Sequence, residues 1–256
     1  YFQKGFFMIN SNTFSNFNSK YPIYADLHTH SISSGHGSED TITDMIRCAS
    51  ESGLSLFGIS DHGPATSSSA KPSYFQSLKL ADRDRFGIRV LYGAELNIIN
   101  TAGDVDLDDE ILSALDYAII SIHPPIFKPY HDKDLSSAYI RAMDHPKVRF
   151  LGHIDDARFP VDFEYLLEIA KEKHVYPEIN NGSLMPDAYR INGQENCRRI
   201  LSICKKLDLP VLLSSDSHGK KNIGNMQYIF PLLEELDFPA HLVLNSDLSA
   251  LSDIIR

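Results

Sequence analysis

The amino-acid sequence predicts an α/β protein whose parallel strands form a closed or nearly closed barrel. Short apolar runs alternate seven times with helical patterns, an order typical of parallel strands joined by crossover helices. The runs are almost continuously apolar rather than alternating, which indicates strands covered on both faces. The length of 256 residues suits one such barrel, because α/β barrels occupy about 200–250 residues as a single domain.

Each predicted strand is an apolar run that ends in polar or glycine-rich sequence. The first helix, over 41–52, can be capped by Asp40 or Thr41, has apolar residues at helical spacing and ends at Gly53. The polar insertion over 65–84 is long enough to be a substrate-facing loop or lid. The strands are expected at 21–25, 56–62, 89–99, 117–123, 149–153, 176–181 and 210–218. The further helices are expected near 74–81 and at 135–143, 163–173, 195–207, 225–235 and 249–254, and the stretch 104–115 is expected to be acidic at first and then helical.

Composition and termini narrow the class of protein. The formal net charge of −10 argues against binding to nucleic-acid backbones. The cysteines, Cys48, Cys197 and Cys204, are odd in number and lack a CxxC spacing, so we expect no disulfide framework, no thiolate metal site and a cytoplasmic setting. No apolar run reaches the length of about 18 residues that spans a membrane, and the start lacks a signal-peptide pattern. Residues 1–20 are predicted to be a tag remnant and flexible N-terminus, because Tyr1-Phe2-Gln3 resembles a cleaved expression tag, and residues 21–256 a single domain.

Histidine and carboxylate side chains interrupt the apolar runs at one recurring place, the carboxyl end of a strand or the loop after it. In the stretch Asp26-Leu27-His28-Thr29-His30, the two histidines lie two residues apart and therefore point to one face of an extended chain. The ends of parallel barrel strands meet at one rim, so the whole set is expected to converge there. The set comprises His28, His30, His36, His62, Glu95, His123, His153, Asp216 and His218.

A metal centre explains this set better than structural roles do. One histidine at a strand end is more often a hydrogen-bonded structural residue, but nine such groups on one rim would repel one another when protonated and lose hydration when buried. Imidazole and carboxylate ligands suit zinc, manganese or iron. A catalytic zinc typically has three protein ligands, so nine groups predict two or three divalent ions. The other histidines, His131, His145, His174 and His241, are expected to be surface or structural residues.

The ordered motifs from residue 24 onward resemble those of the PHP (polymerase and histidinol phosphatase) superfamily. They are Asp26-Leu-His-Thr-His30, Ser60-Asp-His-Gly63, Gly93-Ala-Glu95, Ile122-His123, Gly152-His153 and Ser215-Asp-Ser-His218. The sequence also resembles the small bacterial phosphatase branch of this superfamily, at Gly35-His36 and at Glu178-Ile-Asn-Asn181 with Asn196-Cys-Arg198. This resemblance implies a single distorted (β/α)₇ barrel of parallel strands with outer helices and a trinuclear site. It implies one ion at His28, His30, Glu95 and Asp216, a second at Glu95, His123 and His153, and a third at His36, His62 and His218.

The predicted function is hydrolysis of a small-molecule phosphomonoester by a metal-activated water. Asp61 is expected to orient a ligand histidine, with a role as leaving-group acid as the alternative. Arg158, five residues after His153, and Arg190, in the loop after the sixth strand, are candidates for binding phosphate. Lys128 is a weaker candidate.

Other functions stay open at this point. An amidohydrolase-like enzyme would act on C–N bonds, but such barrels often carry a carbamylated lysine at strand four, where this chain has His123. PHP-type exonuclease action is disfavoured by the acidic charge, and a non-catalytic metal-binding protein by the complete ligand set. The sequence does not determine the oligomeric state, nor whether the leaving group comes from histidinol phosphate, a sugar phosphate or a nucleotide.

Overall fold

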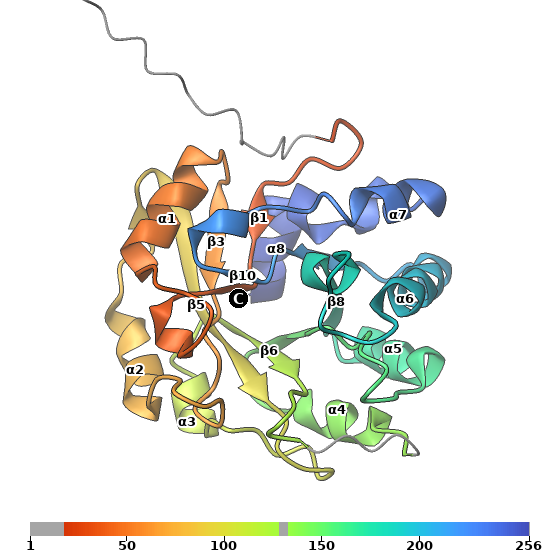
Figure 1. The fold of residues 1–256 in the computed structure, drawn as a ribbon, viewed down its shortest axis with the longest axis horizontal. Coiled ribbons are helices and arrows are strands. Elements are labelled where there is room, and N and C mark those ends of the chain that lie inside the picture. The colour runs from red at the N-terminus through yellow and green to blue at the C-terminus, as the bar shows by residue number, and fades with distance from the viewer. Residues whose placement is uncertain (1–17, 128–132, 256) are drawn as a thin grey trace, which may run out of the picture.

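The barrel predicted from the sequence is present in the computed structural model, which describes residues 18–127 and 133–255 (Figure 1). Seven parallel strands follow one another around it. The fold class is therefore confirmed as a nearly closed α/β barrel. In their order around the sheet, the strands are β1 (Ala25–Asp26), β3 (Leu56–Ile59), β5 (Ile88–Asn97), β6 (Tyr117–Ser121), β7 (Val148–Leu151), β8 (Tyr176–Asn180) and β9 (Leu212–Ser214).

Two short pairings extend the barrel. Strand β4 (Asp84–Arg85) forms an antiparallel hairpin with the start of β5. Strand β2 (Thr29–His30) pairs in parallel with β10 (Ser217–His218), so that His30 lies opposite His218. The second pairing joins the first and last parts of the barrel at the rim where the predicted ligands lie.

Asn245 fills the gap between β9 and β1 lower in the barrel. Its side-chain oxygen accepts a hydrogen bond from the Leu213 amide at 2.7 Å, and its amide nitrogen donates to the carbonyls of Leu213 at 2.7 Å and Ala25 at 2.8 Å. The Asn245 carbonyl accepts from the Tyr24 amide at 3.0 Å. One fully buried residue thus supplies the hydrogen bonds that a direct strand pair would make there.

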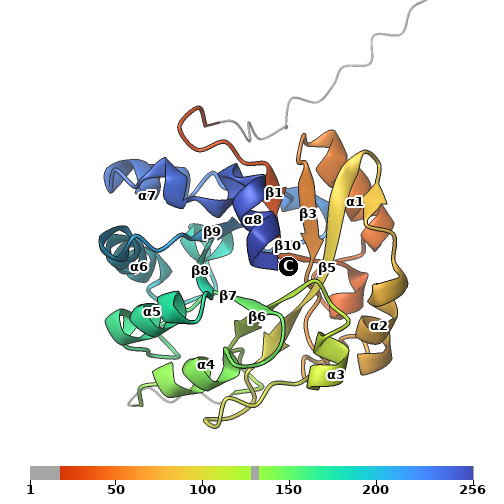
Figure 2. The same ribbon diagram turned by 180° about the vertical axis from the view of Figure 1, so that it is seen from behind.

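Helices surround the strands on the outside (Figures 1 and 2). The exception is α8, whose Leu251 and Ile255 pack with the residues inside the barrel, at the end that faces the viewer in Figure 2. No helix in the described ranges is both long and apolar enough to cross a membrane. The helices are α1 (Ile42–Glu51), α2 (Pro72–Ser77), α3 (Asp109–Leu112), α4 (Ser136–Ala142), α5 (Phe163–Glu172), α6 (Gly193–Leu207), α7 (Phe230–Glu235) and α8 (Leu248–Ile255).

Tyr117 closes the barrel interior beneath the strand ends. Its hydroxyl donates to the Leu27 carbonyl at 2.5 Å, between Asp26 and His28. The ring fits only because two neighbours lack a side chain: a Cβ on Gly58 would lie 2.3 Å from the Tyr117 hydroxyl oxygen, and one on Gly93 would lie 2.8 Å from its ring. The backbone that carries His28 therefore rests on a tightly packed aromatic ring.

Several predicted boundaries were wrong, and a cap or a proline explains two of them. The helix expected after the acidic start of the stretch 104–115 is confined to α3, because the Asp108 side chain caps it by accepting from the Ile111 amide. The helix expected over 225–235 begins only at Phe230, with a proline in its first turn. The helix expected near 74–81 begins earlier, at Pro72, and ends in a 3-10 turn over Leu78–Leu80.

The seventh predicted strand, over 210–218, is broken in the structure. Asp216 has a φ of 51°, a left-handed conformation that ends β9 and turns the chain before β10. The first strand is also shorter than expected and begins at Ala25. Residues 1–20 were predicted to be a tag remnant and flexible N-terminus, and residues 1–17 of this segment lie outside the described chain. The remainder is held to the end of α7, where the Lys20 amine lies 2.8 Å from the Asp237 carboxylate. The single domain over 21–256 stays a prediction.

Candidate metal centre

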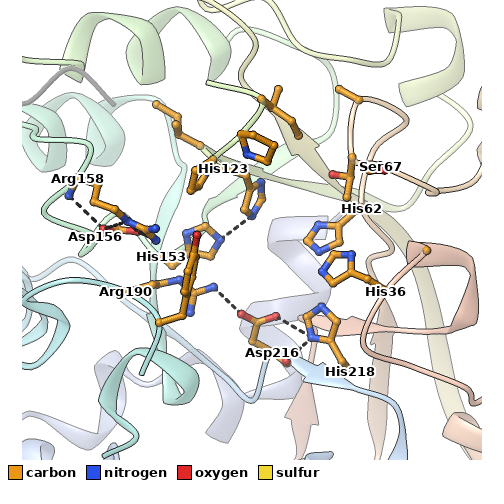
Figure 3. Close-up of a pocket in the computed structure, with 18 of the residues that line it drawn as sticks. His36, His62, Ser67, His123, His153, Asp156, Arg158, Arg190, Asp216 and His218 are labelled. Atoms are coloured by element: carbon orange, nitrogen blue, oxygen red, sulfur yellow. Dashed lines mark hydrogen bonds and ion pairs between the residues drawn. The ribbon is translucent and has the colours of Figure 1, made fainter. Parts of the chain in front are cut away.

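The nine predicted ligands come together at the carboxyl ends of the barrel strands. Six of them line a cavity of about 720 Å³, and Figure 3 shows these six around its wall. His28, His30 and Glu95 are fully buried and lie against the others from below. The six lining residues are His36, His62, His123, His153, Asp216 and His218.

Glu95 lies at the centre of the set. It lies within β5. His62, in the loop after β3, forms a parallel β-bridge with Glu95, and this pairing brings the His62 ring to the carboxylate. Five imidazoles surround its two oxygens. Oε1 lies 2.9 Å from His153 Nε2, 3.2 Å from His123 Nε2 and 3.4 Å from His28 Nε2, and Oε2 lies 2.6 Å from His62 Nδ1 and 3.5 Å from His30 Nε2.

Asp216 forms a second centre beside the first. Its Oδ1 lies 3.2 Å from His30 Nε2, 3.7 Å from His28 Nε2 and 3.8 Å from His218 Nδ1. The loop that carries Asp216 is anchored by Asp26, which accepts from the Ser215 hydroxyl at 2.5 Å and the Gly224 amide at 2.8 Å. Asp26 therefore supports the site from the strand end.

The donor atoms have the arrangement that metal ions require. Several buried ligand atoms make no hydrogen bond within the described chain, among them His28 Nε2, His30 Nε2, Glu95 Oε2 and His218 Nε2. Such atoms are costly in a folded protein unless they meet a cation or another partner. Three groups of donors each fall within 4.8 Å: His28, His30 and Asp216; His30, His62 and His218; and His62, Glu95 and His123.

His36 and His153 lie at the edges of these groups. The His36 ring stacks on His62 with centroids 4.9 Å apart and lies 5.1 Å from His218. The His153 ring reaches Glu95 and lies 3.1 Å from His123, measured between their Nε2 atoms. Both rings thus adjoin the donors of the three groups. The residues present fit a cluster of divalent ions.

The pKa values of Glu95 and His30 shift in the direction that metal binding needs. The pKa of His28 shifts the other way: burial lowers it, but the carboxylates of Glu178, Glu95 and Asp216 outweigh burial and hold it well above its usual range. Burial alone would raise the pKa of Glu95, but the rings of His123, His28 and His62 outweigh burial and hold it well below its usual range. Burial lowers the pKa of His30 well below its usual range, and the neighbouring rings of His62 and His218 lower it further. An ionised carboxylate and a neutral imidazole are the forms that bind a metal.

A shell of polar residues orients the ligand rings. Glu178 lies with Oε1 2.5 Å from His28 Nδ1, and its Oε2 accepts from the His153 amide at 2.7 Å. Asn97 Oδ1 lies 2.8 Å from His123 Nδ1. Outer partners of this kind fix which ring nitrogen faces a metal. The sequence reasoning assigned no role to Glu178 or Asn97, although a carboxylate inside the apolar run 176–181 was a usable signal for Glu178.

Asp61 is enclosed beside the metal ligands. It accepts from the Ser31 amide at 2.7 Å, the Ser34 hydroxyl at 2.7 Å and the Tyr74 hydroxyl at 2.5 Å. The Ser34 hydroxyl lies 3.0 Å from His30 Nδ1, so Asp61 acts on a ligand histidine through Ser34. Asp61 is fully buried and does not line the cavity, which favours the orienting role over the leaving-group acid.

Arg158 and Arg190 both line the cavity, and both are paired with aspartates. Arg190 Nη2 donates to Asp216 Oδ2 at 2.7 Å, on the carboxylate oxygen that faces away from His30. Arg158 donates to both oxygens of Asp156, with Nε 2.9 Å from each. Figure 3 shows Arg190 beside the histidines and Arg158 farther from them.

The other predicted residues lie away from the cavity or outside the described chain. His145 pairs with Asp109 at 2.7 Å, and His241, with 71% of its side chain exposed, lies 3.4 Å from Asp208. His174 adopts a left-handed backbone conformation at the end of α5. All three cysteines are free. Lys128 and His131 fall outside the described residues.

Barrel and cavity together are those of an α/β-barrel protein with candidate metal ligands at the carboxyl ends of its strands. More narrowly, the chain belongs to the PHP domain family, because the profile of the PHP domain matches residues 26–182. A protein of Clostridium acetobutylicum named as a probable phosphatase is 37% identical over 222 residues, which cover 87% of this chain and 90% of that protein. The predicted family is therefore confirmed, as is the class of enzyme, a metal-dependent phosphatase, at the level of the family.

Solved structures share the fold at lower sequence identity. The putative histidinol phosphatase of Listeria monocytogenes superposes with a TM-score of 0.59 at 18% identity, covering 80% of this chain and 99% of that one. The histidinol phosphate phosphatase of Lactococcus lactis, solved with zinc, L-histidinol and phosphate, gives a TM-score of 0.58 at 21% identity, covering 84% of this chain and 94% of that one.

Proposed function

We propose that this protein hydrolyses a small phosphomonoester with the help of two or three divalent metal ions. The observation that carries the proposal is the convergence of nine histidine and carboxylate side chains at one rim of the barrel, six of them lining one cavity, with buried donor atoms that make no hydrogen bond in the described chain. The relatives named as probable phosphatases and the zinc and phosphate in the Lactococcus structure support the same reading.

Three ions suit the donor set best. His28, His30, Glu95 and Asp216 would hold the first, with Glu95 shared with a second at His123 and His153, and His36, His62 and His218 would hold the third. The close donor groups support this division in part, since His28, His30 and Asp216 form one group. His62 also adjoins Glu95 and His123, so its assignment to the third ion is the least constrained. Zinc, manganese and iron all accept these ligands.

When bound, the ions supply Lewis acidity for the phosphoryl oxygens and a water of lowered pKa. The residues of the chain hold and orient this machinery. Glu178 and Asn97 fix the rings of His28 and His123, and Asp61 acts on His30 through Ser34. Arg190 holds Asp216 Oδ2, which leaves Oδ1 toward the histidines. Arg190 and Arg158 line the cavity and are the candidate phosphate ligands, because a guanidinium matches phosphate geometry.

The rival functions are less well supported. An amidohydrolase-like enzyme would often use a carbamylated lysine, but no lysine is among the described residues that line the cavity. Exonuclease action would bring a nucleic-acid backbone to a chain whose formal net charge is −10. The substrate of the proposed reaction is therefore a small molecule that carries one phosphate ester.

The decisive experiment measures metal content and hydrolysis together. The protein is stripped with a chelator, reloaded with Mn²⁺, Zn²⁺ or Fe²⁺, analysed for bound metal and assayed with phosphomonoesters, a phosphodiester, an amide and single-stranded DNA. We expect two or three ions per chain and turnover of monoesters alone. Fewer than two tightly bound ions under every metal supply would contradict the multinuclear site, and preferential cleavage of DNA or the amide would contradict the reaction.

Matched histidine substitutions test the ligand assignment. His30→Ala removes a buried donor and should lower kcat/KM by at least about 100-fold, since loss of an outer partner alone costs about 10–100-fold. His241→Ala removes an exposed imidazole far from the cavity and should leave both activity and metal content unchanged. Full activity in the His30 variant would show that this residue is not part of the metal site.

A further inference from the structure

The cavity has a second region that the ions would not occupy. Asp156, Arg158 and Tyr189 line it beyond the metal ligands, and Pro124 to Ile126 line it as well. In Figure 3, Arg158 and Asp156 lie on the far side of His153 from His36 and His62. A cavity of about 720 Å³ is much larger than a phosphate group, since pockets of about 300–1,000 Å³ enclose drug-sized ligands. Room therefore remains for the alcohol part of an ester.

Tyr189 presents an open aromatic ring in this region. The Arg158 guanidinium covers the ring with its carbon 4.2 Å from the ring centroid. Tyr189 is nevertheless 74% exposed, which is unusual for a large aromatic residue that lines a cavity. A ring that is held by a cation and still open to solvent can accept a second flat group.

The surrounding loops hold this ring in place. Asp156 fixes Arg158 through both carboxylate oxygens, and the Ala157 amide donates to the Ile191 carbonyl at 2.9 Å, which ties the loop after β7 to the loop after β8. The Asn196 side chain on α6 donates to the Asp155 carbonyl at 2.7 Å. Arg158, which covers the ring, and the loops on either side of Tyr189 are thus positioned before any ligand arrives, which lowers the entropy lost on binding.

The charges of this region disfavour a second anionic group. Arg158 and Arg190 are the arginines among the described residues that line the cavity. Arg158 is paired with Asp156 and Arg190 with Asp216. Because these arginines are also the candidate ligands of the substrate's one phosphate, a second phosphate would find no further arginine in the described lining, whereas an uncharged ring would meet the open face of Tyr189.

We propose that Tyr189 is a specificity-determining residue that stacks on a planar aromatic or heteroaromatic ring in the alcohol part of the substrate. This inference rests on the proposed phosphomonoester hydrolysis. It narrows the substrate class to monophosphates whose alcohol carries such a ring.

The test compares Tyr189→Ala with Tyr189→Phe and with Tyr165→Ala, which removes an exposed tyrosine from the outer helix α5. Substrates are phenethyl phosphate, which has a ring, and butyl phosphate, which has none. Binding of their non-hydrolysable analogues, phenylpropylphosphonate and pentylphosphonate, is measured by calorimetry on the metal-loaded protein. The calorimetry reports on the subsite independently of turnover.

We expect Tyr189→Ala to raise KM for phenethyl phosphate and Kd for phenylpropylphosphonate by about 3–10-fold, with the ring-free compounds and kcat changed by less than about twofold. Tyr189→Phe and Tyr165→Ala should match the wild type. Equal effects on both compounds, or none, in an active enzyme would overturn the subsite while the proposed function stands. Selective binding without hydrolysis would overturn the function while the subsite stands.

Discussion

Two buried carboxylates show how local charge decides the effect of burial. Glu95 is surrounded by imidazoles, which outweigh burial and hold its pKa well below the usual range. Asp155 is equally buried, and Arg190, the cation that lowers its pKa, already pairs with Asp216. Burial therefore raises the pKa of Asp155 to about 6. At neutral pH Asp155 is thus ionised in the folded protein, and its buried charge lowers the free energy of unfolding.

The Asp155→Asn substitution should stabilise the metal-free protein at neutral pH. The folded pKa of about 6 lies above the unfolded value of 3.8, so the stability that wild-type Asp155 contributes is full below pH 3.8 and is lost as pH rises through 6. We expect the variant to be more stable than wild type by about 1–3 kcal/mol at about pH 7.5, with the difference falling below about 1 kcal/mol near pH 4.5.

Urea unfolding in the presence of a chelator measures this difference at both pH values. Asp187→Asn, at an exposed position, is the control and should change stability by less than about 0.5 kcal/mol. A variant that is less stable than wild type at both pH values would show that the ionised carboxylate is needed by Arg190.

The residues of the site were predictable where they broke a pattern. His62, His123 and His153 stand out because a polar ring follows an apolar strand, and the structure brings them together around Glu95. Asn97 gave no such signal, because a polar residue near a strand end is common. The partner that a side chain meets depends on strand register, which the sequence does not state.

At the scale of elements, the order of strands followed from the apolar runs, whereas their ends depended on single residues. The break at Asp216 needs a left-handed backbone that Asp adopts only in a suitable context. The role of Asn245 was equally hidden, since closure of the barrel through a side chain depends on a gap between β9 and β1 that appears only in three dimensions.

Asn245→Asp should weaken the closure of the barrel. The substitution replaces the amide nitrogen, which donates to the carbonyls of Ala25 and Leu213, with an oxygen that would face both. We expect a loss of about 2–4 kcal/mol in the free energy of unfolding, because buried carbonyls lose their donors and a charge is buried.

Chemical denaturation measures the effect, with Asn192→Asp as the matched control at an exposed position. The control should lie within about 0.5 kcal/mol of wild type. Equal stability of the Asn245 and Asn192 variants would mean that the side chain of Asn245 does not hold the two strands together.

At the scale of the whole molecule, the ligand cluster joins strands from all around the barrel. His28 and His30 come from its start, Glu95 from β5, and Asp216 and His218 from its end. Metal ions that bind these residues would therefore link parts of the chain that are far apart in sequence. Because unfolding separates the ligands, metal binding and folding stability are coupled.

Metal addition should raise the melting temperature of the chelator-treated protein. At a free concentration about 100 times Kd, one ion adds about 2.7 kcal/mol, which corresponds to roughly 5–10 °C for a chain of this size. Differential scanning fluorimetry with Mn²⁺ or Zn²⁺ measures the shift. Glu95→Gln, which removes the central charge, should lose most of it, and a shift of the same size in that variant would place the binding elsewhere.

The ring of Tyr117 also limits the route by which ions and phosphate would reach or leave the ligands. Together with the buried residues of the inner core, it fills the space below His28 and leaves the rim as the way to the ligands in the described part of the chain. A metal ion that dissociates and a phosphate that is released would then leave through the same opening at the rim. Product that lingers in the cavity would trap the ions beneath it, so metal loss would be slowest while the protein is turning over.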